Sequence, residues 1–173
     1  MEESISIGGG KLEKRVLVAV VERADGRRDV YKGDNLVTNS GLYYYAHQGA
    51  VQGGAGSYNW PAGCRLGTNN VTAPAGTDIG VNAVIASGSV ATTAAYPVHS
   101  DADTDNSGRG TLVASWLFTF GTGLVNLDNI GEIAIVSSLT VAGSALSHGT
   151  ITTFSKGSQD SLKFFVNHTY SAT

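Results

Sequence analysis

Thr111-Leu-Val-Ala-Ser-Trp-Leu-Phe-Thr-Phe120 and Asn129-Ile-Gly-Glu-Ile-Ala-Ile-Val-Ser137 are the two stretches that decide the fold class. In the first stretch every second residue is apolar, which is the period of a pleated strand, and we expect the face that carries Trp116 to lie in the core. In the second stretch two isoleucines share a face opposite Glu132. The two stretches predict neighbouring strands of a central sheet, joined by a wide loop over residues 121–129.

A charged hairpin is predicted before this pair. Arg15–Arg23 is rich in β-branched residues, residues 24–27 contain an Asp-Gly dipeptide, and Arg28–Lys32 returns. Asp-Gly between two such runs indicates a hairpin, because glycine adopts the positive φ that tight turns require. Residues 1–34 hold seven acids and seven bases, whereas the other 139 residues hold seven acids and four bases. We therefore expect this hairpin to be an edge ribbon whose charges discourage strand addition.

A single helix is predicted after the hairpin. Thr38 or Asn39 can cap its first turn, and the helical pattern continues to about Gln48, where Gly49 provides a stop. Residues three and four positions apart share one face of a helix, and this face is expected to pack on the sheet. The residues on it are Leu42, Tyr45 and Ala46.

Further short strands are bounded by polar or glycine-rich turns. They are Cys64–Thr68, Ser87–Tyr96, Ser147–Phe154 and Leu162–Tyr170, of which the last two are expected to form a C-terminal hairpin. With about eight strands and one early helix, the chain is predicted to be mainly β. The expected architecture is an antiparallel β-sandwich or jelly roll with one short helix in its N-terminal half.

The length of the chain predicts one domain. A chain of 173 residues can bury roughly 70% of its unfolded surface around a single core. We expect residues 11–173 to form that domain and residues 1–10 to form a flexible arm. Gly8, Gly9 and Gly10 have no side chains to pack and lose the most entropy on ordering. These glycines are the first candidate interaction residues, because a hinged arm can reach a neighbouring molecule.

Charge and hydropathy argue against several classes of function. Charged residues make up 14% of the chain, against about 25% in a typical domain, and the net charge is −3. Without a run of Lys and Arg to displace phosphate counterions, we expect no nucleic-acid partner. The apolar runs are far shorter than the roughly 20 residues of a membrane helix, and no secretory signal pattern opens the sequence. We therefore expect no membrane partner and synthesis in a cytoplasm.

One stretch resembles a metal-binding loop. Asp101, Asp103 and Asp105 alternate in a short polar segment, and carboxylates so placed can wrap Ca²⁺. An EF-hand loop would need glycine in place of Asn106, an acid in place of Leu112, and flanking helices. A polar turn is the favoured interpretation, with Ca²⁺ binding by the three aspartates as the alternative. No other metal and no cofactor is expected.

Residue spacing indicates no catalytic site. The four histidines are scattered, with no His-x-x-x-His pair, and no Gly-x-Ser-x-Gly elbow is present. Cys64 is the single cysteine, so an internal disulfide is excluded and a small buried apolar role is expected. Tyr58 and Trp60 lie near the end of a glycine-rich loop over residues 49–63 and are candidate contact residues.

Four blocks of sequence carry a resemblance to a known group of proteins. They are Asn35-Leu-Val-Thr-Asn-Ser-Gly-Leu42, Cys64-Arg-Leu-Gly-Thr-Asn-Asn-Val-Thr-Ala-Pro-Ala-Gly-Thr-Asp78, Ile130-Gly-Glu-Ile-Ala-Ile135 and Phe154-Ser-Lys-Gly-Ser-Gln-Asp-Ser-Leu-Lys-Phe164. In this order they resemble the virion structural proteins of tailed bacteriophages. The charged N-terminal hairpin and the loop over residues 49–63 depart from that pattern and leave the position in the particle open.

The resemblance implies a non-enzymatic subunit without catalytic or cofactor-binding residues. Such a subunit would assemble as a homo-oligomer in the tail, neck (collar) or baseplate region, join other virion structural proteins, and reside in the virion after synthesis in the host cytoplasm. The low charge and the many Ser, Thr and Gly residues agree with a surface that identical neighbours cover.

A carbohydrate-binding β-sandwich module for recognition of a host surface is the alternative. Tyr58, Trp60 and the Tyr43–Tyr45 cluster would then form a platform on which sugar rings stack. For the three consecutive tyrosines, amphipathic packing of the helix is the favoured interpretation.

Overall fold

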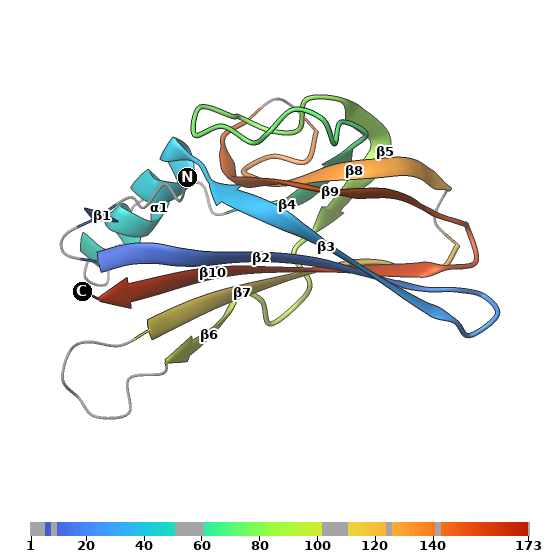
Figure 1. The fold of residues 1–173 in the computed structure, drawn as a ribbon, viewed down its shortest axis with the longest axis horizontal. Coiled ribbons are helices and arrows are strands. Elements are labelled where there is room, and N and C mark those ends of the chain that lie inside the picture. Colours follow the sequence, from blue (N-terminus) through green and yellow to red (C-terminus); the bar gives the residue numbers. More distant parts are fainter. Residues whose placement is uncertain are drawn as a thin grey trace.

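The computed structural model describes residues 6–7, 10–50, 61–101, 111–123, 126–140 and 143–172 (Figure 1). Within these residues the chain is mainly β, with ten antiparallel strands and one short helix, so the predicted fold class is confirmed. In chain order the elements are β1 (Ser6–Ile7), β2 (Gly10–Glu22), β3 (Arg28–Val37), α1 (Asn39–Ala50), β4 (Gly63–Gly67), β5 (Val84–Ala91), β6 (Val98–Asp101), β7 (Thr111–Phe120), β8 (Leu127–Val136), β9 (Ala145–Lys156) and β10 (Ser161–Ala172).

The strands form one curled sheet in the order β5-β4-β8-β9-β3-β2-β10-β7-β6, and β1 adds to β2. Strand β3 belongs to both sides of the curl. Its first part pairs with β2 from Arg28 to Gly33, and its second part pairs with β9 from Gly33 to Val37. We call β2, β10, β7 and β6 the β10 half, and β9, β8, β4 and β5 the β8 half. Figure 1 shows the two halves one above the other, joined by β3.

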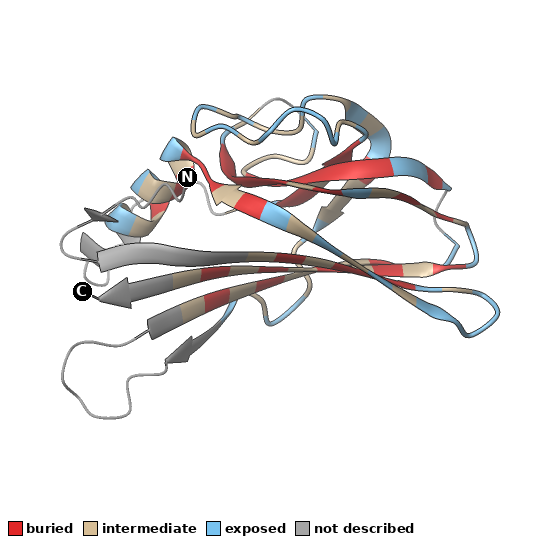
Figure 2. Cartoon of the chain, in the orientation of Figure 1, coloured by how far each residue is buried: buried red, intermediate tan, exposed pale blue. Residues whose placement is uncertain are grey.

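One apolar core fills the space between the two halves (Figure 2). In β7 and β10 alternate side chains are buried, as the two-residue period predicts, and Trp116 is 2% exposed. The expectation that the Trp116 face lies in the core is confirmed, and Cys64 is buried as predicted. This curl around one core is consistent with the predicted sandwich or jelly roll. The largest fully buried apolar side chains are Leu17, Leu66, Trp116, Phe118, Phe120, Leu127, Ile130, Ile133, Ile135, Leu162 and Phe164.

The predicted N-terminal hairpin is present as β2 and β3, and Gly26 at its tip has a φ of 84°. Its expected position as an edge ribbon is wrong, because β2 also pairs with β10 and β3 also pairs with β9. The charges of the hairpin bind the neighbouring turn instead. Arg23 contacts Asp29 at 2.7 Å and Asp160, in the turn between β9 and β10, at 2.9 Å.

Two predicted strand pairings are wrong. Strand β7 pairs with β10 and β6, whereas β8 pairs with β9 and β4, so the two stretches that decide the fold class lie in different halves. Similarly, β9 and β10 follow one another in the chain but belong to different halves. The chain therefore passes from one half to the other between β7 and β8 and again in the turn over residues 157–160, and hydrophobic period alone does not distinguish such a crossing from a hairpin.

The predicted helix is present, and Thr38 caps it, since its hydroxyl accepts a hydrogen bond from the Gly41 amide at 3.1 Å. The predicted packing face is partly wrong. Tyr44 is buried and Ala46 is exposed, because the helix presents Tyr44 and Tyr45 to the core.

Candidate functional site

The outer face of the β8 half is covered by a loop that its own chain supplies. Residues 68–83 leave β4, run over β8 and enter β5, and both ends of the loop are held by one carboxylate, that of Glu132. Its Oε1 accepts hydrogen bonds from the amides of Asn69 (3.3 Å) and Ala83 (2.8 Å), and its Oε2 accepts one from Asn82 (3.0 Å). A surface loop with its ends so close together is an Ω-loop, a form that is frequently functional.

Glu132 reaches this position because Gly67 lies opposite it. The two residues are register partners in β4 and β8, and a Cβ atom on Gly67 would lie 2.2 Å from Glu132 Oε1. A glycine at this point of the strand therefore leaves room for the carboxylate.

His148 completes the cluster from the adjacent strand β9. Its Nε2 lies 2.9 Å from Glu132 Oε2 and its Nδ1 lies 2.6 Å from Asp78 Oδ2, and the histidine side chain is fully buried. Both ring nitrogens face carboxylate oxygens, and both can donate only when the imidazole is protonated. The cluster is therefore an imidazolium between two carboxylates, one of them on the loop.

The pKa shifts in the cluster agree with this assignment. Burial would lower the pKa of His148, but the hydrogen bonds to Glu132 and Asp78 outweigh it and raise the pKa above its ordinary value of 6.5. Burial would raise the pKa of Glu132, but its bonds to His148 and to two backbone amides lower it below 4.5. Each group thus favours the charged form of the other.

This cluster has the composition of a catalytic site but not the geometry of a general base. A base needs an unprotonated nitrogen within reach of the proton that it removes, and both nitrogens of His148 are occupied. A hollow of about 370 Å³ opens beside Asp78. The Asp78 carboxylate contacts His148 and also accepts a hydrogen bond from the Ala75 amide at 2.8 Å. Among the described residues no group of three or more His, Cys, Asp or Glu side chains is arranged to hold a metal ion. The cluster acts as an anchor for the loop.

The loop presents apolar side chains to solvent. Val71 is 89% exposed and Ile79 is 61% exposed. The backbone around Val71 is fixed by Asn69, whose side-chain oxygen accepts hydrogen bonds from the amides of Val71 (3.0 Å) and Thr72 (3.2 Å). The loop therefore offers exposed apolar side chains on a fixed backbone, although a single exposed valine is ordinary on a protein surface.

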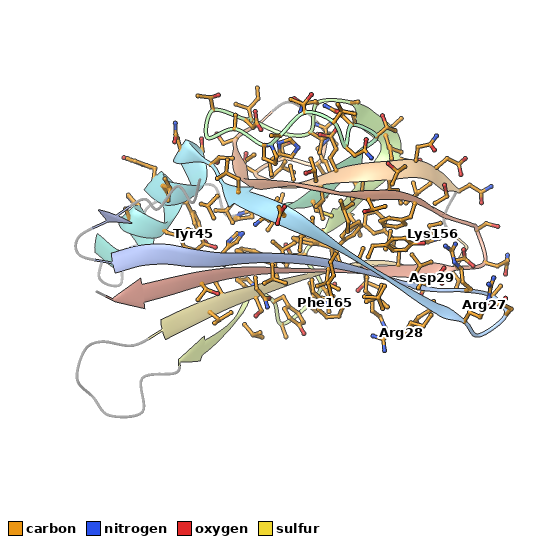
Figure 3. All side chains as sticks on the ribbon, in the orientation of Figure 1. Arg27, Arg28, Asp29, Tyr45, Lys156 and Phe165 are labelled. Carbon is orange, nitrogen blue, oxygen red and sulfur yellow. The ribbon has the colours of Figure 1, made fainter. Side chains whose placement is uncertain are left out.

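The outer face of the β10 half has no such covering loop in the described part of the chain. Paired strands bring Val18, Phe165 and Leu117 side by side on this face, and Val30 and Val98 are 54% and 43% exposed. Val18, Val30, Val98 and Phe165 line a hollow of about 580 Å³. In Figure 3, Phe165 and Arg28 point away from the core on the lower side of the molecule. We call this apolar surface the outer β10 face.

Cations outnumber acids among the described residues of the outer β10 face. Arg28, Lys32 and Lys163 occupy outward positions on β3 and β10, against the carboxylates of Glu22, which lies 3.3 Å from Lys163, and of Asp34, which is exposed two residues after Lys32. The whole chain has a net charge of −3, so this face is opposite in sign to the protein that carries it. An apolar hollow with a basic rim fits a protein partner.

A second buried histidine, His168, lies on the core side of β10. His168 contacts the hydroxyl of Tyr45 (Nδ1, 2.6 Å) and the amide nitrogen of Asn35 (Nε2, 2.9 Å), and the Trp116 indole donates to Tyr45 at 3.3 Å. These bonds tie α1 to β3, β7 and β10. The network positions the helix and satisfies buried polar groups.

Most of the sequence-predicted interaction residues lie outside the described part of the chain. These are Gly8, Gly9, Tyr58 and Trp60. Gly10 is the first residue of β2 and pairs with Ile7 and Ala172, so the part of the predicted arm that is described is paired strand. Of the weak Ca²⁺ candidates, Asp101 ends β6 opposite Leu112, while Asp103 and Asp105 lie outside the described residues.

Sequence reasoning missed the Glu132 cluster. The available signal was a carboxylate within the apolar strand Ile130-Gly-Glu-Ile-Ala-Ile135, since a charge in a buried strand needs a partner. Its partner Asp78 lies 54 residues before it and its partner His148 lies 16 residues after it. No motif has this spacing, so only the fold brings the three residues together.

Comparison with known proteins finds no matching family model, no matching curated protein and no matching solved structure. No helix among the described residues is long and apolar enough to cross a membrane.

Proposed function

We propose that this protein is a non-enzymatic structural subunit of a tailed-bacteriophage particle, in the tail, neck or baseplate region, and that it acts as a homo-oligomer joined to other virion proteins. The observation that carries the proposal is the outer β10 face, a strand surface with exposed Val30 and Val98 around an apolar hollow. A partner that covers this face would remove apolar area from water, at about 25 cal/mol per Å². Assembly is thus the activity that the described surface supports best.

The positions of the sequence blocks support the same proposal. Thr38 and Asn39, Gly67 to Asp78, and Glu132 come from three of the four blocks that resemble virion proteins, and they meet around one loop. Thr38 caps the helix, Asn39 donates its amide to the carbonyl of Gly76 in the loop at 2.7 Å, and Glu132 closes the loop. The residues behind the resemblance therefore build the scaffold, as expected for a structural protein.

The carbohydrate-binding alternative loses part of its proposed platform. Tyr44 is buried, Tyr45 bonds to His168, and only Tyr43 of the three tyrosines is exposed, at 56%. Three adjacent rings therefore do not form a flat surface on which sugars could stack.

The proposal can be tested by mass photometry of the purified chain and of two matched variants. Val30→Asp places a charge on the outer β10 face, whereas Thr152→Asp places the same charge on a residue of similar shape, exposed on β9 of the other half. We expect the unaltered chain and Thr152→Asp to form oligomers, and Val30→Asp to shift to a monomer whose circular dichroism spectrum is still that of the folded chain.

A particle assay completes this test. Mass spectrometry of purified phage particles from the source of the sequence should detect the chain in stoichiometric amounts. A protein that stays monomeric at all concentrations and is missing from those particles would contradict the proposed function.

A further inference from the structure

We infer that copies of this chain contact one another head to tail, with the Ω-loop of one copy seated in the hollow of the outer β10 face of the next. This inference rests on the proposed function and specifies its interface. The loop contributes Val71 and Ile79, and the receiving face contributes Val18, Val30, Val98 and Phe165.

The first argument is the position of the exposed apolar groups. Val71 and Ile79 lie on the loop that covers the β8 half, whereas Val30 and Val98 lie on the β10 half. Figure 1 shows the loop, in green, along the upper side of the molecule and the β10 half along the lower side. Two apolar surfaces on opposite sides of a subunit generate a heterologous contact, which builds rings or filaments rather than closed pairs.

The second argument is shape. The outer β10 face is hollowed by about 580 Å³, which is the volume of several side chains, and Val71 of the loop is 89% exposed, whereas Ile79 lines the smaller hollow beside Asp78. The Val71 side chain can enter a hollow, whereas two hollows placed face to face would leave a void between them. Voids at an interface forfeit dispersion contacts and lower affinity.

The third argument is charge. Two outer β10 faces placed together would bring Arg28, Lys32 and Lys163 of one copy near the same three cations of the other, against Glu22 and Asp34 on each side. Like charges across an interface are unfavourable. Residues 68–83, which form the loop, contain one acid and no base, so the head-to-tail contact avoids this repulsion. Arg65 lies in β4, where it lines the hollow beside Asp78.

The fourth argument is preorganisation. Glu132 fixes both ends of the loop through the amides of Asn69, Asn82 and Ala83, and His148 and Asp78 hold it from below. A loop that is ordered before contact loses little conformational entropy on binding. The cluster at Glu132 thereby serves the interface without touching the partner.

Cysteine cross-linking tests the inference, because the one native cysteine, Cys64, is buried and can stay in place. Val71→Cys and Val30→Cys are prepared separately and mixed in equal amounts at a concentration where mass photometry shows oligomers. After mild oxidation we expect disulfide-linked dimers in the mixture and none in either variant alone. The double variant Val30→Cys/Val71→Cys should give a ladder of covalent oligomers, and Thr152→Cys mixed with Val71→Cys, the matched control, should give no product.

The outcomes separate this inference from the proposed function. A cross-linked dimer of Val30→Cys alone would show that the outer β10 faces meet each other, which would overturn the head-to-tail arrangement but leave assembly intact. Oligomers without any Val71–Val30 product would overturn it as well. A second variant, Val71→Asp, should reduce oligomers at least tenfold with an unchanged circular dichroism spectrum, since Val71 is 89% exposed within its own chain. An unaltered chain that is monomeric throughout would contradict the proposed function itself.

Discussion

The outer surfaces of the two halves of the sheet differ in how far they are covered. In the β8 half both faces are covered, since Ile133 and Ile135 face the core and Ala134 and Val136 pack beneath Val81 of the Ω-loop. In the β10 half the inner face is equally buried, but the outer face leaves Val30 exposed. A strand buried on both faces reads as a continuous apolar run, whereas a strand with one wet face alternates with polar residues.

This difference shows that an apolar outer face requires a cover, which can come from the same chain or from another. On the β8 half the cover is anchored by a buried ion cluster at Glu132 and His148. On the β10 half the outward positions of β2 are also apolar: Val16 and Val18 are half-buried there, and Val20 is 3% exposed. The following predictions test how far the two halves differ.

The largest effect is expected at the inner face, which the two halves share. Trp116→Ala should lower the free energy of unfolding by about 3–5 kcal/mol, because it empties the space of a large buried ring and removes the indole that donates to Tyr45. Urea denaturation followed by circular dichroism measures the change. Both halves should unfold in one transition, and separate transitions would show that the halves have independent cores.

The next effect is expected from removal of the cover on the β8 half. Glu132→Gln should cost about 3 kcal/mol, because it leaves the His148 imidazolium in a buried site without one of its two carboxylates. The amides of Asn82 and Ala83 should also exchange with deuterium faster than those of β7 and β10. Uniform acceleration over the whole sheet would contradict a local role for Glu132 as loop anchor.

A matched pair of substitutions compares the outer faces directly. Val136→Thr places a hydroxyl beneath the covering loop and should cost about 1–3 kcal/mol, because no water reaches it there. Val30→Thr makes the same change on the outer β10 face and should stay within about 0.5 kcal/mol in the monomer. The two midpoints of denaturation check this, and equal losses would remove the distinction between covered and uncovered faces.

The smallest effect is expected from pH. The pKa of His148 is raised in the folded state, so its contribution to stability is complete below pH 6.5 and declines as the pH rises through the raised value. The pKa of Glu132 is lowered, so its contribution is complete above pH 4.5 and declines as the pH falls through the lowered value. The contribution of the pair is therefore greatest between about pH 4.5 and 6.5.

Melting temperatures from pH 4 to 9 measure this dependence, with Asp78→Asn as the comparison. This substitution removes one of the two carboxylates that contact His148, so the decline of the melting temperature at alkaline pH should move to lower pH. A decline at the same pH in both proteins would mean that another group causes it.

Much of the fold follows from local patterns in the sequence. The alternating residues around Trp116, the Asp-Gly tip at Gly26 and the cap at Thr38 are decided by neighbours in the chain, and all three were predictable. The pairing of strands was not, because a turn such as residues 157–160 can either close a hairpin or cross to the other half. In the folded chain Arg23 contacts Asp160 in that turn at 2.9 Å, a contact between residues far apart in the sequence.

The candidate site was less predictable than the fold. Ile133 and Ile135 indicate one buried face of β8, but burial of the other face depends on the loop over residues 68–83, which no period in β8 reveals. Glu132 could have been singled out as a lone acid in an apolar strand. Its pairing with His148 depends on the register between β8 and β9, which includes irregular steps.

The pairing of β2 with β10 joins strands from the two ends of the chain, so it can form only when synthesis of the chain is nearly complete. Val18 lies opposite Phe165, so β2 leaves the ribosome long before the strand that covers its flank exists. At about 5–20 residues per second, roughly 7 to 30 seconds pass between the synthesis of these two residues. During that time the β2–β3 hairpin can form by itself, with the apolar edge of β2 open to other nascent chains. High expression rates should therefore favour aggregation of incomplete chains, and slower translation should raise the yield of folded protein.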